Sequence, residues 1–164
     1  MPARPAWNTP FTLLQFNLTA GILGPLFALV KSLGGDASLP TMVSELVETY
    51  GVKRYASDDL FAPPASGTSV PDATVIAPAS VSTLGNIANG TGTNLLHRVA
   101  DVALKERKRL VILEREMPYS LVHIKNMAAV TEAGGIITSA APGFYNHPET
   151  LEDLIDFVVG KVLD

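Results

Sequence analysis

Short apolar runs alternate with longer amphipathic stretches along the second half of the chain. The apolar runs cover residues 73–78 (ATVIAP), 109–114 (RLVILE) and 135–140 (GIITSA). The run at 109–114 shows no alternation of apolar and polar positions, which is typical of a strand covered on both faces, as in a parallel sheet. The pattern therefore predicts three strands of one parallel sheet.

The stretches between and after these strands have the spacing of helices. In the last of them Asp153 stands three residues after Thr150, an arrangement that resembles a helix cap. Alternating strands and helices predict an α/β fold, a three-layer, Rossmann- or flavodoxin-like doubly wound parallel sheet that binds ligands at the carboxyl ends of its strands. The predicted helices cover residues 81–88, 94–107, 119–132 and 150–163.

The first part of the chain has a less regular pattern. Residues 11–18 (FTLLQFNL) fit a strand, 19–21 a turn, and 22–33 a helix that ends at a glycine pair. A second helix is predicted at 40–50, where apolar residues recur every three to four positions. Residues 57–73 are rich in proline, glycine and small polar residues, which marks a candidate active-site loop.

One segment also has the length of a membrane span, because no charge lies between Arg4 and Lys31. Gln15, Asn17 and the glycines and proline of residues 21–25 interrupt this segment, and no basic clusters flank it. These features favour a buried strand, turn and helix over a membrane segment.

Composition limits the class of partner. The net charge of -4, without a run of lysines and arginines, argues against nucleic acid or an anionic membrane as the main partner. The chain has no cysteine, which excludes a disulfide framework and a thiolate nucleophile and fits a cytoplasmic protein. Charged residues make up 17%, against about a quarter in a typical soluble domain, so part of the surface is expected to lie in contacts between identical subunits.

Two polar segments directly follow predicted strands. Ser80, Val81, Ser82 and Thr83 open a helix, where hydroxyls and free N–H groups can bind a phosphate or the edge of a flavin; a serine cap alone also explains them. After the second strand, the pair at 115–116 (Arg-Glu) can hold a phosphate bidentately and move a proton, although a surface ion pair is the other interpretation.

Three further residues have chemistry that fits an anion site. Tyr145, after the third strand, offers a phenol and an aromatic face, but a lone tyrosine usually only packs. Lys161, in the last helix, fits either an anion site or compensation of the helix dipole. Lys105 lies in a charged helix end, most simply a solvated face. The three histidines lack the spacing of metal ligands, so no metal site is expected.

Taken together and in this order, these segments resemble the UbiX family of flavin prenyltransferases, within the homo-oligomeric flavoproteins that include Cys-peptide decarboxylases. The PAS and IANG elements are shared with the decarboxylases, whereas Arg-Glu-x-Pro at 115–118 and Phe-Tyr-x-x-Pro at 144–148 resemble the prenyltransferases specifically. The matching segments are 62–67, 75–90, 94–118, 123–137 and 141–164.

The resemblance implies an activity, a cofactor and a set of roles. The family joins dimethylallyl phosphate to reduced FMN at the flavin N5 and C6 atoms, without a metal, and the prenylated FMN serves UbiD-type decarboxylases. By motif, the segment at 80–83 would hold the FMN and Arg115 would contact it. Lys105 and Glu116 would be catalytic, and Tyr145 and Lys161 would bind the prenyl phosphate. Members form homo-oligomers, trimers or dodecamers.

The start of the chain departs from the family pattern. Members begin with a central strand and a Gly-Ala-Ser-Gly turn that holds the FMN phosphate, where this chain has Thr19-Ala20-Gly21. We expect one flavoprotein domain over residues 1–164, with 1–33 as an atypical or incomplete first strand–helix unit. Two alternatives stay open: a non-catalytic flavin-binding or assembly relative, and a flavoprotein like the Cys-peptide decarboxylases.

Overall fold

The computed structural model describes residues 13–15 and 53–164. The helices predicted at 22–33 and 40–50, the turn at 19–21 and the outer residues of the strand predicted at 11–18 lie outside the described residues. Both polar segments of the predicted site, 80–83 and 115–118, lie within the described residues.

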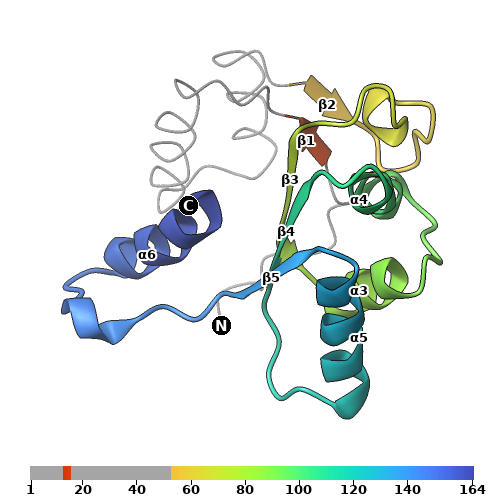
Figure 1. The fold of residues 1–164 in the computed structure, drawn as a ribbon. Coiled ribbons are helices and arrows are strands. Elements are labelled where there is room, and N and C mark those ends of the chain that lie inside the picture. Colours follow the sequence, from red (N-terminus) through yellow and green to blue (C-terminus); the bar gives the residue numbers. More distant parts are fainter. Residues whose placement is uncertain (1–12, 16–52) are drawn as a thin grey trace, which may run out of the picture.

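The centre of the fold is a three-stranded parallel sheet. It contains β3 (Ala73–Ala79), β4 (Arg109–Glu114) and β5 (Ile136–Ser139), in the order β3-β4-β5 (Figure 1). Ala79 pairs with Glu114, and Glu114 pairs with Ser139, so the three strands end together at one edge. This carboxyl edge is the place where ligands bind in open parallel sheets.

Helices cover the sheet in two layers. Figure 1 shows α3 (Val81–Ala88), α4 (Leu95–Lys105) and α5 (Leu121–Glu132) on one side, and α6 (Leu151–Leu163) on the other. The predicted α/β class, with a parallel sheet between two helical layers, is confirmed. Among the described residues, no helix combines the length and the apolar character that a membrane crossing needs.

Each of the described helices α3 to α6 begins at a residue whose side-chain oxygen accepts a hydrogen bond from the backbone N–H three positions on. The predicted capping arrangement of Thr150 and Asp153 is present. Oγ1 of Thr150 accepts the N–H of Asp153, and the Asp153 carboxylate accepts the N–H of Thr150. The helix predicted at 94–107 ends two residues earlier, at Lys105, because Arg107 has a φ of 56°, in the left-handed region. The capping residues are Ser80, Asn94, Ser120 and Thr150.

The main core lies between the sheet and the layer of α3, α4 and α5. Leu110 and Ile112 are fully buried there, next to one another on the same face of β4. Gly85 lets α3 approach α5 closely, since a Cβ on Gly85 would stand 3.3 Å from Nδ2 of Asn126. This packing fixes where α3 and α5 begin at the carboxyl edge.

Truncation of a core leucine should therefore destabilise the fold strongly. We expect Leu110→Ala to lower the free energy of unfolding by about 2–5 kcal/mol, because a fully buried side chain leaves a cavity. The matched control is Leu151→Ala, whose leucine is 67% exposed and should change stability by less than about 0.5 kcal/mol. Urea unfolding followed by circular dichroism measures both, and equal losses would contradict this account of the core.

A second, smaller sheet stands apart from the parallel one. β1 (Leu13–Gln15) pairs with β2 (Lys53–Tyr55), and the two strands are antiparallel. The strand predicted at 11–18 is thus present at Leu13–Gln15, where it pairs with β2 and not with the three parallel strands. The tertiary fold decides which strands become neighbours, and the apolar pattern of residues 11–18 does not show the partner strand.

The predicted loop at 57–73 is packed against the body of the domain. It contains a short 3₁₀ helix, η1 (Pro63–Ala65), and its buried Ala62 and Ala65 form a small core with Leu95 and Val99 of α4. This loop lies at the start of α4 and is held by these apolar contacts.

Candidate functional site

The first predicted segment, Ser80 to Thr83, lies at the carboxyl edge and opens α3. Oγ of Ser80 accepts a hydrogen bond of 3.1 Å from the backbone N–H of Thr83, so the serine does cap the helix. Thr83 is buried, whereas Ser80 and Ser82 are exposed. The first N–H groups of a helix have no partner within it. The capping role and a ligand-binding role are thus compatible here.

The second segment, the loop 115–118, joins β4 to α5. Arg115 and Glu116 are both exposed, and Oε1 of Glu116 accepts a hydrogen bond of 3.1 Å from the N–H of Met117. In the part of the chain that the structure describes, no ion pair joins Arg115 to Glu116. The surface ion pair that the sequence left open is therefore not formed between these two side chains.

A residue that sequence reasoning missed lies directly before this loop. Glu114 is 1% exposed, and Oε2 of its carboxylate accepts a hydrogen bond from the Tyr119 hydroxyl. Its Oε1 atom is buried and has no hydrogen-bond partner among the described residues. The sequence contained one signal for this residue, because Glu114 is a charged residue at the end of the apolar run 109–114.

Tyr145 and Lys161 lie on the α6 side of the sheet. Tyr145, in the 3₁₀ helix η2 (Phe144–Asn146), packs edge-on against Phe157 with ring centroids 5.7 Å apart. Nζ of Lys161 lies 3.0 Å from a carboxylate oxygen of Asp164; this hydrogen bond is the main cause that raises the Lys161 pKa, and Tyr145 adds a smaller electrostatic effect. The structure thus brings the phenol and the ammonium group near one another.

Lys161 also lines a groove between the sheet and α6. The groove has a volume of about 510 Å³, and Ser139 at the carboxyl end of β5 contributes to it. Arg109 and Ile136, at the amino ends of β4 and β5, also line it. Its other walls are largely apolar, with Val111, Phe157 and Val158 among them. An ammonium group beside apolar walls can accommodate a phosphate with a hydrocarbon tail.

Lys105 lies at the opposite edge of the sheet. It lines a cavity of about 670 Å³ together with Arg109 and Ile136, which are the first residues of β4 and β5. The six residues of β4 separate this edge from Glu116 by roughly 17 Å. Within one chain, Lys105 therefore lies apart from the loop 115–118.

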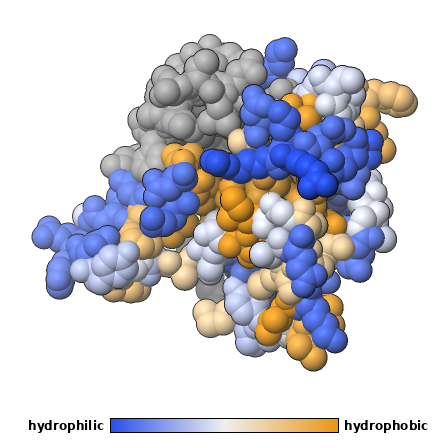
Figure 2. All heavy atoms as spheres, viewed as in Figure 1, coloured by the Kyte–Doolittle hydropathy of each residue, from blue (hydrophilic) through white to orange (hydrophobic). Residues whose placement is uncertain are grey.

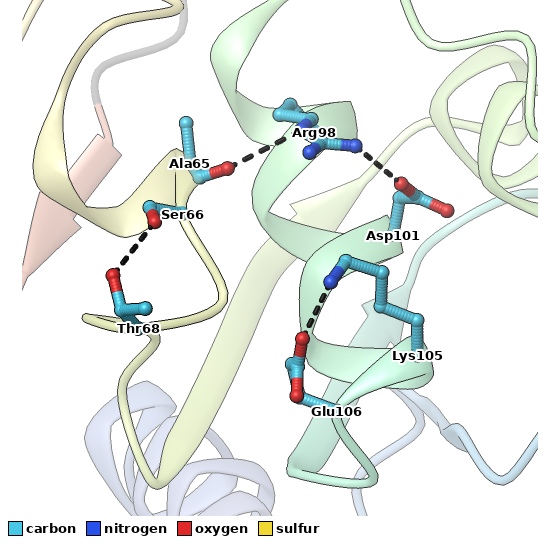
Figure 3. A network of polar contacts seen from close by, with 7 residues as sticks. All are labelled: Ala65, Ser66, Thr68, Arg98, Asp101, Lys105 and Glu106. Carbon is cyan, nitrogen blue, oxygen red and sulfur yellow. Dashed lines mark hydrogen bonds and ion pairs between the residues drawn. The ribbon is translucent and has the colours of Figure 1, made fainter.

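The surroundings of Lys105 are a polar network (Figure 3). Nζ of Lys105 donates to Oε1 of Glu106 at 2.5 Å, and one turn earlier Arg98 pairs with Asp101 at 2.9 Å. Nε of Arg98 also donates to the carbonyl of Ala65 in the 57–73 loop. Arg98, near the start of α4, and Lys105, at its end, are both partly exposed, and Arg98 contacts the loop.

Metal ligation finds no support in the described residues, where no cluster of three or more histidine and carboxylate side chains occurs. His97 is buried at the start of α4, and burial lowers its pKa. Its Nδ1 atom accepts from the N–H of Thr93, which is a structural role.

The residues at the carboxyl edge fit a flavin. A flavin ring carries both carbonyl acceptors and an N–H donor along its edge, and the start of α3 offers hydroxyls and free N–H groups. The partnerless, buried Oε1 atom of Glu114 shows that this edge also holds an acceptor in need of a donor. A doubly wound α/β domain with these groups at its strand ends belongs to the class of nucleotide-cofactor-binding proteins.

Comparisons with known proteins define the family. The model of the flavoprotein family matches residues 27–163. The flavin prenyltransferase UbiX of Pseudomonas aeruginosa is 44% identical over 145 residues, which cover 83% of this chain and 69% of that protein. The chain therefore belongs to the flavoprotein family, and its curated relatives there are UbiX flavin prenyltransferases.

Solved structures agree with the fold. AnUbiX (PadA1), in complex with FMN and dimethylallyl pyrophosphate, has a TM-score of 0.66 and 44% identity, covering 67% of this chain and 58% of that one. A dodecameric FMN-dependent UbiX-like decarboxylase from Escherichia coli O157:H7 has a TM-score of 0.66 and 41% identity, covering 67% and 60%. The chain thus spans between about a half and two thirds of these relatives.

Proposed function

We propose that this chain is a flavin prenyltransferase that joins dimethylallyl phosphate to reduced FMN and releases phosphate. The prenylated FMN would serve a UbiD-type decarboxylase. The observation that carries the proposal is the common edge at Ala79, Glu114 and Ser139, where the hydroxyl turn at 80–83 and the Arg115–Glu116 loop follow neighbouring strands. A relative of 44% identity whose structure contains FMN and dimethylallyl pyrophosphate supports it.

The proposed roles follow from the chemistry at this edge. Bound and reduced, FMN supplies the nucleophilic N5 and C6 atoms. The turn at 80–83 holds the flavin edge through hydroxyls and the start of α3, and Arg115 contacts the cofactor as a fixed cation. Glu116 accepts or returns a proton, while Tyr145 and Lys161 bind the prenyl phosphate. The walls of the α6 groove exclude water from the allylic carbon.

Lys105 requires a second copy of the chain in this proposal. The lysine lies at the amino edge of its own sheet, so it can join Arg115 and Glu116 only in the site of a neighbouring subunit. A UbiX-like relative is dodecameric, which supports this arrangement.

Exposed apolar residues offer the surface for such contacts. On α5, Leu121, Val122 and Ile124 are each more than half exposed, and Ile136 of β5 is 48% exposed. Figure 2 shows apolar residues at the surface over α5 and between α6 and the sheet. Patches of this kind mark interaction surfaces. We propose a closed homo-oligomer, trimeric or dodecameric, in the cytoplasm.

Mixing two inactive variants should test the shared site. Lys105→Ala and Glu116→Gln are each expected to abolish turnover alone. Coexpressed, they should regain activity, because some sites then combine an intact Lys105 from one subunit with an intact Glu116 from another. Coexpression of the double variant with the Lys105→Ala variant is the control, since no such site contains both residues intact. Equal inactivity of both mixtures would contradict a shared site.

The proposed activity itself is tested with purified protein under anaerobic conditions. Reduced FMN with dimethylallyl phosphate, or with the diphosphate in a parallel reaction, should give prenylated flavin detectable by mass spectrometry. Glu152→Gln, which changes an exposed carboxylate in the first turn of α6, should leave the rate unchanged. Absence of the product with either substrate, in a preparation that binds FMN, would contradict the proposal.

One observation favours a second candidate. The segment at 19–21 lacks the Gly-Ala-Ser-Gly sequence that the family uses to hold the FMN phosphate. A non-catalytic, flavin-binding or assembly relative would co-purify with intact homologues and show no turnover alone. Flavin absorbance of the purified chain, with and without added FMN, separates the two candidates.

A further inference from the structure

Glu114 stands in a position where the fold alone would favour an apolar residue. It continues the row of Leu110 and Ile112 on β4, and since side chains alternate along a strand, it points to the same face as those two. It is 1% exposed, and one of its carboxylate oxygens has no partner among the described residues. Burial of such a group costs free energy, so its presence indicates a role other than stability.

The groups around Glu114 connect it to the next helix. Its Oε2 atom accepts the hydroxyl of Tyr119, and its carbonyl accepts the N–H of Ala140 at 2.9 Å, at the end of β5. Tyr119 directly precedes Ser120. Oγ of Ser120 accepts the N–H of His123 and so caps α5, while Nδ1 of His123 accepts the N–H of Ser120. Both ends of the loop 115–118 are thus fixed, one to the sheet and the other to a helix start.

We propose that the hydrogen bond between Glu114 and Tyr119 is a clasp that positions Arg115 and Glu116 for prenyl transfer. This inference rests on the proposed function. The clasp joins the two residues that flank the loop, while the side chains inside the loop are exposed and make few contacts of their own. Glu114 and Tyr119 are positioning residues, since they act through their neighbours.

The Tyr119 hydroxyl stays protonated in the neutral pH range and can therefore donate to Glu114. The hydrogen bond to Glu114 is the main cause that raises the Tyr119 pKa, followed by burial; the nearby charge of Glu116 acts in the same direction, and Ser139 opposes it. A phenol with a raised pKa stays protonated to a higher pH than usual, so its O–H continues to donate.

Three variants test the clasp in the full chain. Tyr119→Phe removes only the hydroxyl, Glu114→Leu replaces the carboxyl with an apolar group of similar size, and Glu114→Gln keeps an oxygen that accepts the phenol. Glu152→Leu, at an exposed position of α6, is the matched control. The measurements are the turnover number, the dissociation constant of FMN, the melting temperature and hydrogen–deuterium exchange of the amides of residues 115–117.

The clasp predicts a separation of activity from stability. Tyr119→Phe and Glu114→Leu should lower the turnover number about 10- to 100-fold, because a displaced loop misaligns the reacting groups. Exchange at 115–117 should become faster, FMN affinity should fall because Arg115 contacts the cofactor, and the melting temperature of Glu114→Leu should be equal or higher. Glu114→Gln should retain most of the activity.

Other results would overturn it. Wild-type turnover and wild-type exchange in Tyr119→Phe would show that the hydrogen bond does not hold the loop. A loss of activity in Glu114→Leu that only follows a lower melting temperature would indicate a purely structural residue. Should the wild-type chain make no prenylated flavin, the proposed function fails, and exchange at 115–117 still decides whether the clasp holds the loop.

Discussion

Glu116→Gln is expected to lower the turnover number by about 10²- to 10⁴-fold, the range in which a positioned general acid or base contributes. The variant keeps the size and the hydrogen-bonding shape of the side chain but removes its ability to take a proton. Its Oε1 atom can still accept the N–H of Met117, so the loop should keep its conformation. The affinity for FMN should stay within about threefold, because Glu116 is not proposed to hold the cofactor.

The measurement combines initial rates of prenylated flavin formation with titration of FMN fluorescence. Glu152→Gln is a matched control, because Glu152 is an exposed carboxylate on α6. Parallel losses of turnover and of FMN binding would instead assign Glu116 to the integrity of the loop.

The second large effect concerns the cation at the end of α6. Lys161→Ala should lower kcat/KM by about 10²- to 10³-fold, because a fixed cation stabilises the charge that develops on the departing phosphate. The hydrogen bond with Asp164 raises the Lys161 pKa. A raised pKa means that the positive charge is present at all pH values below the ordinary lysine range, so the effect of the variant should not change between pH 6 and 9.

Lys125→Ala provides the control for this variant, since Lys125 is an exposed lysine on α5. Lys161→Arg should recover part of the rate, because arginine keeps the charge with another shape. An unchanged kcat/KM for Lys161→Ala would remove this residue from the phosphate site, and Tyr145 would then have no cationic partner in the described groove.

Much of the fold could be predicted from the sequence, because its strands and helices carry clear local patterns. The strand at 109–114 and the helix at 81–88 agree with β4 and α3 residue for residue. Thr150 and Asp153 form the predicted cap. Local sequence determines these features, since helix caps and apolar runs act over a few neighbouring residues.

The candidate site could be predicted only in part. The turn at 80–83 and the loop at 115–118 follow strands of one parallel sheet, so their common edge could be inferred from chain order. The same reasoning would have set Lys105 apart, because it precedes a strand and residues there lie at the amino edge. The resemblance to the family led instead to a single pocket that included it.

The sequence by itself thus determined the class of fold, the succession of β3, β4 and β5 with their helices, and the chemical groups that follow each strand. The tertiary structure decided which of these groups meet. Strand register aligned Ala79 with Glu114 and Ser139, and β1 paired with β2 rather than with the parallel sheet. Burial of Glu114 against the Tyr119 hydroxyl also came from packing, because the distance between side chains depends on how helices and strands are placed, which no local pattern encodes.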